Sequence, residues 1–304
     1  MPVARDLFAP GSACVTAPLF GAKLMVTSDP SLAPPASAPS LRSFIQRNSE
    51  FGGRKLRKFA NYIDLYERIF SQFVGRRPRI LEIGVQHGGS LRMWQDYFRG
   101  EAEIFGIDLL PECKRFEEDN VQIFIGDQSD SKFISDVSSR IGSLDIVIDD
   151  GSHVPRHQIA SFEQFFYNNL TEGGYYIVED CNTSYWHHYG GGLKRKGTFI
   201  EFSKDLCDAV NAWHAGNKKL PVTNATRWIK RITFESSLVV FEKQLMEAPP
   251  HISSGNEEID TQDIFADASY GHLLKYLRGF APLRYAVRNN QFLWNLMRKN
   301  IEKK

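Results

Sequence analysis

The chain has 304 residues, of which 42% are hydrophobic and 24% are charged, and its formal net charge is +1. A chain of this length and composition buries a sizeable core, which excludes wholesale disorder. The balanced charge argues against nucleic acid as the main partner. None of the four cysteines forms a CxxC pair, and no stretch approaches the ~18 apolar residues of a membrane span. We therefore expect a cytoplasmic protein without a zinc ribbon or a disulfide scaffold.

The first 75 residues contain two different kinds of segment. Residues 1–40 hold seven of the fourteen prolines and are rich in Ala and Ser, which predicts a disordered arm, with a partner-binding arm as the alternative. Residues 41–75 carry apolar residues at helical spacing. A basic run in this stretch predicts a solvated helix face, and the alternative is a lid helix that places a cation over an anionic ligand. The residues of the run are Arg54, Lys55, Arg57 and Lys58.

From residue 79 onward, short apolar runs bounded by turn residues alternate with helical patterns. Fully apolar strands that alternate with helices are typical of a parallel sheet covered on both faces. The predicted strands are Arg79–Gly84, Ile104–Leu109, Val121–Asp127, Leu144–Asp150 and Tyr175–Asp180. The predicted helices lie around residues 90–99, 130–140, 157–169 and 199–214. We therefore predict a doubly wound, mostly parallel, Rossmann-like α/β domain over residues 41–250, with an antiparallel C-terminal hairpin (228–234 and 238–243) at the sheet edge.

Residues 251–304 differ from this domain in charge. We expect an acidic loop first. From Leu273 to Lys304, eight basic residues stand against one acidic residue and interleave with apolar residues. Such a basic amphipathic helical tail is expected to dock its apolar face on its own domain or on a second copy of the chain, giving a homo-oligomer. Peripheral contact with an anionic membrane is the alternative.

The carboxyl ends of the first three strands carry the pattern of a nucleoside site. Asp108 ends the second strand, where an acid accepts hydrogen bonds from ribose hydroxyls. The turn after the first strand is not GxGxxG, which argues against a dinucleotide-binding dehydrogenase. Together these strand ends resemble the S-adenosylmethionine (SAM) site of class I methyltransferases. The candidate cofactor-binding residues are Glu82, Gly84, Gly88, Ser90, Asp108, Asp127, Gln128 and Asp149.

The ends of strands four and five carry a second cluster of acids. Asp150 follows the fourth strand, and Glu179 and Asp180 follow the fifth. Neighbouring strands lie about 4.8 Å apart, so these carboxylates should share one small volume and repel one another unless a cation bridges them. Oxygen ligands favour Mg²⁺, with Mn²⁺ as the alternative, and the other interpretation is a set of caps and turn acids. His153, three residues after Asp150, is the candidate general base.

Five motifs together resemble the mycinamicin-type macrolide sugar O-methyltransferases over about residues 50–245. They are Leu81–Trp94, Gly126–Asp130, Asp145–His153, Gly173–Asp180 and Thr183–Trp186. The resemblance implies a SAM- and Mg²⁺-dependent enzyme that methylates a sugar hydroxyl of a glycosylated natural product or glycan. It also implies that Asp150, Glu179 and Asp180 are metal ligands and that His153 is the base. The chain departs from these relatives in having a short Pro-rich arm where they carry a large auxiliary domain.

Aromatic residues after the fifth strand are expected to cover the sugar, because aromatic rings suit sugar C–H faces. The candidate substrate-contacting residues are Tyr185, Trp186 and His187. Two other functions remain open. One is a related metal-dependent enzyme acting on a catechol or a β-lactam-type metabolite. The other is a SAM-binding regulatory or scaffold protein that has lost turnover.

Overall fold

The computed structural model describes residues 40–255. The predicted N-terminal arm, apart from residue 40, and the predicted acidic loop and basic tail, apart from residues 251–255, lie outside the described residues. The chain divides into two units, residues 1–248 and 249–304, and every helix and strand given below belongs to the first. Among the described residues, no helix has the length and apolar character needed to cross a membrane.

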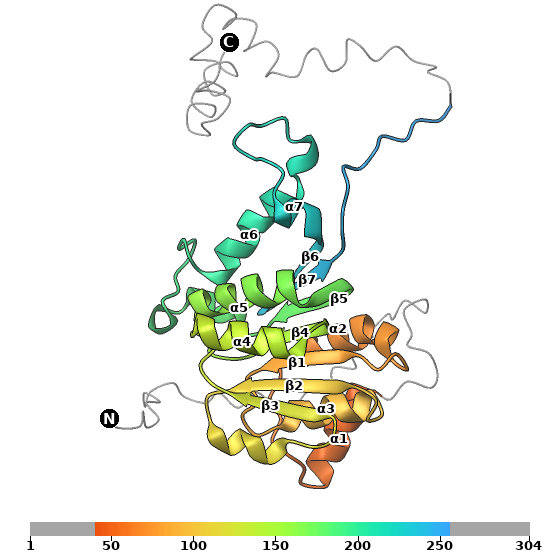
Figure 1. Ribbon diagram of the computed structural model, residues 1–304, viewed down its shortest axis with the longest axis vertical. Coiled ribbons are helices and arrows are strands. Elements are labelled where there is room, and N and C mark those ends of the chain that lie inside the picture. The colour runs from red at the N-terminus through yellow and green to blue at the C-terminus, as the bar shows by residue number, and fades with distance from the viewer. Residues whose placement is uncertain (1–39, 256–304) are drawn as a thin grey trace, which may run out of the picture. The chain divides into compact units, whose positions relative to one another are not determined.

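The described residues form one seven-stranded sheet with the strand order β3-β2-β1-β4-β5-β7-β6 (Figure 1). The strands are β1 (Arg79–Ile83), β2 (Glu103–Asp108), β3 (Val121–Ile125), β4 (Leu144–Asp149), β5 (Leu170–Val178), β6 (Ile229–Glu235) and β7 (Leu238–Lys243). β1 to β5 are parallel, and β7 pairs antiparallel with both β5 and β6. The predicted doubly wound sheet and its antiparallel edge hairpin are confirmed.

Helices cover both faces of this sheet because its central strands are apolar on both sides. The helices are α1 (Leu41–Glu50), α2 (Ala60–Phe70), α3 (Gly89–Tyr97), α4 (Ser131–Ile141), α5 (Pro155–Asn168), α6 (Phe199–Val210) and α7 (Asn224–Trp228). Short 3₁₀ helices are η2 (Ser71–Phe73), η3 (Pro111–Phe116), η4 (Cys181–Tyr185), η5 (His187–Tyr189) and η6 (Ala212–His214). α1, α2 and α3 pack on one face, and α4, α5 and α6 pack on the other (Figure 1). Because β1 to β5 are parallel, their carboxyl ends lie along one edge of the sheet.

The basic run at residues 54–58 does not lie on a helix. α1 ends at Glu50 and α2 begins at Ala60, so the run belongs to the connection between them. Lys58 turns inward, and its side chain is only 3% exposed because it contacts three carboxylates of the sheet. The predicted solvated helix face and the lid helix are therefore both wrong for Lys58, since the anionic groups it covers belong to the protein itself.

The turn after β1 depends on Gly84, whose φ of +97° lies in the left-handed region. A Cβ at Gly84 would stand 2.2 Å from the backbone oxygen of Asp150. Gly84→Ala is therefore expected to lower the free energy of unfolding by about 2–4 kcal/mol, from backbone strain plus overpacking. Urea denaturation of the two proteins measures this loss.

Gly75→Ala is the matched control for this substitution. Gly75 also has a positive φ, +75°, but a Cβ there would meet no atom within 4 Å. Gly75→Ala should lower the free energy of unfolding by the backbone strain alone, about 1–2 kcal/mol. Equal losses at the two glycines would contradict the close packing of the β1 turn against the end of β4.

Candidate functional site

Two cavities open side by side at the carboxyl ends of the strands. The first, of about 260 Å³, lies around the turn after β1, and we call it the glycine-turn cavity. The second, of about 310 Å³, lies between the ends of β4 and β5, and we call it the acidic cavity. Gln86 and Asp150 line both cavities, so the two adjoin at these residues. A ligand in one cavity can therefore reach a ligand in the other.

Besides Asp150, two carboxylates that accept backbone hydrogen bonds lie in the wall of the glycine-turn cavity. Asp108 accepts the backbone N–H groups of Val85 and Gln86, each at 2.8 Å, and so ties the end of β2 to the turn after β1. Asp127 accepts the backbone N–H of Ser129 at 2.7 Å, and this hydrogen bond lowers the pKa of Asp127. Anionic acceptors between apolar walls suit a nucleoside, whose ribose and base offer hydroxyl and amine donors.

Half of the predicted cofactor-binding residues line the glycine-turn cavity. They are Gly84, Asp108, Asp127 and Gln128. The amide of Gln128 is already engaged inside the protein, because its Nε2 donates to both oxygens of Asp149 at 2.9 Å and its Oε1 accepts the N–H of Ser152. Asp149 lies behind Gln128 and is fully buried, and this burial raises the pKa of Asp149 to about 7.

The remaining three, Glu82, Gly88 and Ser90, do not line that cavity. Glu82 is fully buried under α3, where its carboxylate accepts the indole N–H of Trp94 at 3.0 Å and the hydroxyl of Ser90. Gly88 caps the start of α3 with a φ of +67°, and a Cβ there would contact the ring of Phe116. Glu82, Gly88 and Ser90 therefore support the turn between β1 and α3 and do not face the glycine-turn cavity.

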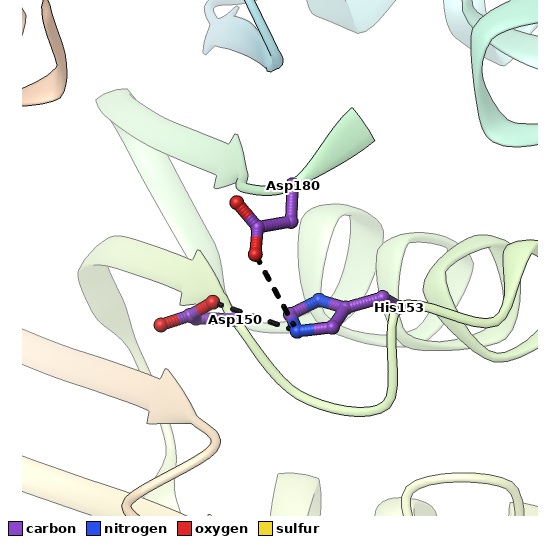
Figure 2. A group of neighbouring side chains, drawn as sticks. All are labelled: Asp150, His153 and Asp180. Carbon is purple, nitrogen blue, oxygen red and sulfur yellow. Dashed lines mark ion pairs between the residues drawn. The ribbon is translucent and has the colours of Figure 1, made fainter. Parts of the chain in front are cut away.

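The acidic cavity brings together Asp150, His153 and Asp180. His153 Nε2 lies 3.7 Å from Asp180 Oδ2 and 4.0 Å from Asp150 Oδ1 (Figure 2). One ligand atom from each residue lies within 4.8 Å of the others, a spacing that could hold a metal ion. Both His153 and Asp180 have positive φ, 55° and 51°, a conformation that stores strain and is common at functional sites. The Thr183 hydroxyl contacts the backbone oxygens of both residues and joins their loops.

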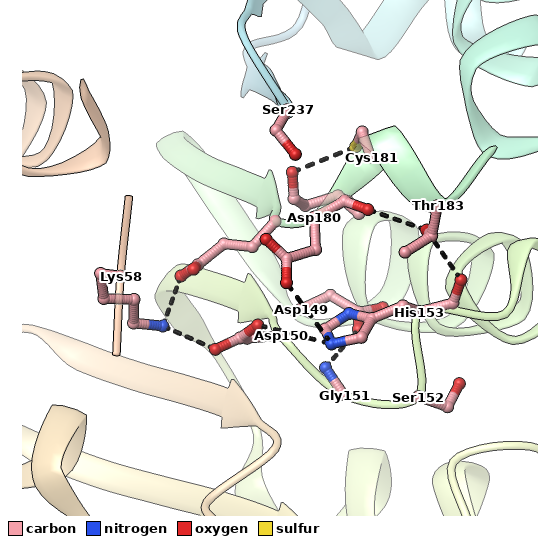
Figure 3. A network of polar contacts seen from close by, with 12 residues as sticks. Lys58, Asp149, Asp150, Gly151, Ser152, His153, Asp180, Cys181, Thr183 and Ser237 are labelled. Atoms are coloured by element: carbon pink, nitrogen blue, oxygen red, sulfur yellow. Dashed lines mark hydrogen bonds and ion pairs between the residues drawn. The ribbon is translucent and has the colours of Figure 1, made fainter. Parts of the chain in front are cut away.

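Glu179 also lines the acidic cavity, and its carboxylate forms an ion pair with Lys58. The Lys58 ammonium lies 2.9 Å from Asp150 Oδ2 (Figure 3). It also lies 2.6 Å from Glu179 Oε1 and 3.4 Å from Glu82 Oε1. Burial alone lowers the pKa of Lys58, but the charges of the three carboxylates outweigh it and raise that pKa above the ordinary value. The Tyr66 hydroxyl donates a further hydrogen bond to Glu179 Oε1. All three predicted metal ligands line the acidic cavity, and Asp150 and Asp180 face His153, whereas Glu179 contacts Lys58 and Tyr66.

Aromatic side chains close the outer side of the acidic cavity. Trp186 and Tyr189 line it, whereas Tyr185 and His187, which were predicted beside Trp186, do not. Tyr62 on α2 also lines the cavity, and its hydroxyl contacts Asp180 Oδ1 at 3.1 Å. The sequence analysis missed Tyr62 and Tyr189, and its only signal for Lys58 was the basic run.

Curated proteins similar to this chain are sugar O-methyltransferases. One is the 8-demethyl-8-alpha-L-rhamnosyl tetracenomycin-C 2'-O-methyltransferase of Streptomyces olivaceus, 35% identical over 192 residues, which are 60% of this chain and 50% of that protein. Another is the mycinamicin VI 2''-O-methyltransferase of Micromonospora griseorubida, 38% identical over 48% of this chain and 38% of that protein. The chain thus spans about half or less of the length of these relatives. No protein-family model matches it.

Solved structures give the same result. The MycE methyltransferase from the mycinamycin biosynthetic pathway, in complex with Mg and SAH, is 30% identical with a TM-score of 0.61 over 68% of this chain and 55% of that one. A second MycE structure, with Mg, SAH and mycinamycin VI, has the same identity and TM-score over 69% of this chain. This chain therefore has the class I methyltransferase fold and resembles the mycinamicin-type macrolide sugar O-methyltransferases.

Proposed function

We propose that this protein is a SAM- and Mg²⁺-dependent O-methyltransferase that acts on a sugar hydroxyl of a glycosylated natural product or glycan. The observation that carries the proposal is the meeting of His153 with Asp150 and Asp180 in a cavity adjoining a nucleoside-sized one. The similar proteins named above support it, because each is named as a methyltransferase of glycosylated compounds or of their pathway.

The glycine-turn cavity fits SAM by its donor and acceptor pattern. Asp108 would accept the ribose hydroxyls, and Asp127 would accept the adenine amine, while Gly84 lets the backbone approach the ligand closely. SAM, when bound, supplies an electrophilic methyl group. Because Gln86 and Asp150 belong to both cavities, that methyl group would face the acidic cavity.

The acidic cavity fits a hard divalent cation. Asp150 and Asp180 keep 22% and 34% of their side chains exposed, so both can reach an ion that retains several waters. Mg²⁺ commonly binds through one or two carboxylates in this way, and the same oxygen ligands suit Mn²⁺. The cation, when bound, lowers the pKa of a coordinated sugar hydroxyl. His153 would take the hydroxyl proton on Nε2, the nitrogen that faces the two carboxylates.

Trp186 is proposed to pack against the sugar of the acceptor. Trp186→Ala is expected to raise the KM for the acceptor about tenfold, because the aromatic contact with the sugar is lost, and to leave the Kd for SAM unchanged. Tyr185→Ala is the matched control, since both residues are 45% exposed but only Trp186 lines the acidic cavity. Steady-state kinetics with the acceptor varied measures both. An equal rise for the two variants would contradict the assignment.

The function is tested by incubating the full chain with methyl-labelled SAM, Mg²⁺ and a panel of acceptors. The panel contains deoxyhexosyl polyketide glycosides, a catechol and a β-lactam metabolite, and mass spectrometry locates the added methyl group. We expect labelling of a sugar hydroxyl. Labelling of the catechol or the β-lactam alone would assign the alternative metal-dependent enzyme. SAM binding by calorimetry without transfer to any acceptor would favour a non-catalytic SAM-binding protein.

We also propose a cytoplasmic location, where the three cysteines that are free among the described residues would stay reduced. The basic tail is proposed to dock on its own domain or on a second copy of the chain. Sedimentation of the full chain with and without anionic liposomes separates this proposal from peripheral membrane contact.

A further inference from the structure

The glycine-turn cavity offers no positive charge to the amino-acid end of SAM. Asp108, Asp127 and Asp150 line this cavity, and none of the described residues in its wall is Lys, Arg or His. The three carboxylates suit the hydroxyl, amine and ammonium donors of SAM, but they repel its carboxylate. A cation that pairs with the carboxylate of SAM must therefore come from outside the glycine-turn cavity.

The adjoining acidic cavity has two basic side chains in its wall, Arg57 and Lys58, besides His153, the proposed base. Lys58 is already engaged, because its ammonium contacts three carboxylates of the sheet. Arg57 is exposed, and within the part of the chain that the structure describes its guanidinium has no hydrogen-bond or ion-pair partner. Arg57 is therefore the cation in this wall that is free to bind an anionic group.

The segment that carries Arg57 is held in place on both sides of it. Before it, the guanidinium of Arg54 forms an ion pair with Glu118 at 3.0 Å. After it, Lys58 is fixed by its three carboxylates. The backbone on either side of Arg57 is thus anchored to the domain, while the Arg57 side chain itself stays unengaged.

The same segment packs against the start of α3. A Cβ at Gly89 would stand 2.2 Å from the backbone oxygen of Lys55, so the two backbones touch. Gln86, in the turn between β1 and α3, lines the acidic cavity together with Arg57 and also lines the glycine-turn cavity. A SAM molecule with its nucleoside in the glycine-turn cavity and its methyl group toward the acidic cavity therefore passes Gln86, and its carboxylate can reach Arg57.

We propose that Arg57 binds the carboxylate of SAM and so positions the amino-acid end of the cofactor where the two cavities adjoin. The proposal rests on the proposed function, because it concerns the SAM site of that function. Arginine suits this role, since its planar guanidinium donates two parallel N–H groups to the two oxygens of a carboxylate. Holding this end of SAM keeps the methyl group directed toward the acceptor hydroxyl.

The test compares two ligands that differ only in the carboxylate, by calorimetry on the full chain without acceptor or turnover. S-adenosylhomocysteine (SAH) carries the carboxylate, and S-adenosyl-3-thiopropylamine lacks it. Arg57→Met is expected to raise the Kd for SAH about tenfold, the usual effect of losing a hydrogen-bonded charge, and to change the Kd for the decarboxylated ligand less than about twofold. Arg57→Lys keeps the charge without the planar fork and should raise the Kd for SAH only about threefold.

Lys55→Met is the matched control. Lys55 is an exposed cation of the same segment, but it lines neither cavity. Its loss should leave both Kd values within about twofold of the wild type, because an exposed charge at a distance is screened by salt.

Two results would overturn the proposal. If Arg57→Met weakens both ligands equally, the substitution disturbs the cavity and the carboxylate is not the group that Arg57 binds. If Arg57→Met leaves the Kd for SAH unchanged, Arg57 does not contact the cofactor, and a raised KM for a uronic acid glycoside in the same variant would assign Arg57 to an anionic acceptor.

The same measurements separate this proposal from the proposed function. A wild-type chain that binds neither ligand overturns both the SAM site and the role of Arg57. A chain that shows the expected pattern of binding but transfers no methyl group to any acceptor overturns the proposed function and supports the role of Arg57. Methyl transfer to a sugar hydroxyl by a chain in which Arg57→Met affects both ligands equally supports the proposed function and overturns the role of Arg57.

Discussion

His153→Ala is expected to lower the kcat for methyl transfer by roughly 10²- to 10⁴-fold, the usual effect of losing a general base. A sugar hydroxyl is a poor nucleophile at neutral pH, and Nε2 of His153 is positioned beside the two carboxylates where that hydroxyl would be bound. The Kd for SAM should stay within about twofold, because His153 lines the acidic cavity and not the glycine-turn cavity. Single-turnover kinetics and calorimetry measure the two effects.

His157→Ala is the matched control. His157 lies on the first turn of α5, its Nδ1 contacts the hydroxyl of Ser152 at 2.9 Å, and it lines neither cavity. Its loss should change kcat by no more than a few-fold. A His153→Ala enzyme that turns over at the wild-type rate would eliminate His153 as the base. An equal loss in both variants would point to distortion of the loop between β4 and α5.

The sheet was predictable because its signal is local. The runs that became β1 and β4 are mostly apolar, and each is followed by a turn and a helical pattern. A strand that is covered by helices on both faces of its sheet is apolar in this way. Because a helix connects each strand to the next by a crossover, the strands run parallel. The edge hairpin followed from the short connection between β6 and β7.

The meeting of Asp150 with Asp180 was also predictable, since β4 and β5 are neighbours and end at one edge. The position of Glu179 was not. Asp180 adopts a left-handed conformation, so the chain turns between the two acids, and their side chains separate. Both line the acidic cavity, but Glu179 contacts Tyr66 on α2 and Lys58, whereas Asp180 faces His153. Hydrophobic periodicity in the sequence does not predict the direction in which a single side chain such as Glu179 points.

The alternation of side chains along β1 could have predicted that Glu82 is buried under a helix. Leu81 and Ile83 pack with the helices of one face, and Ile80 packs with those of the other. Glu82 shares the face of Ile80, so its side chain lies under α3 beside Trp94 instead of at the turn. Lys58 offered no such rule, because its position depends on the path of a non-helical connection that only tertiary contacts determine.

Removal of divalent ions with EDTA is expected to lower methyl transfer by about 10²-fold or more, and added Mg²⁺ should restore it. Asp180→Asn should raise the Mg²⁺ concentration for half-maximal activity at least tenfold, since it removes a carboxylate that faces the acidic cavity while leaving the Lys58 contacts in place. Asp136→Asn, at an exposed acid of α4, is the control and should leave that concentration unchanged. Because the substitution acts on the ion and not on SAM, saturating Mg²⁺ should recover most of the kcat of Asp180→Asn. Full activity of the EDTA-treated wild type would show that the carboxylates organise His153 by charge alone, and the hydroxyl would then have to be activated by the imidazole without help from a cation.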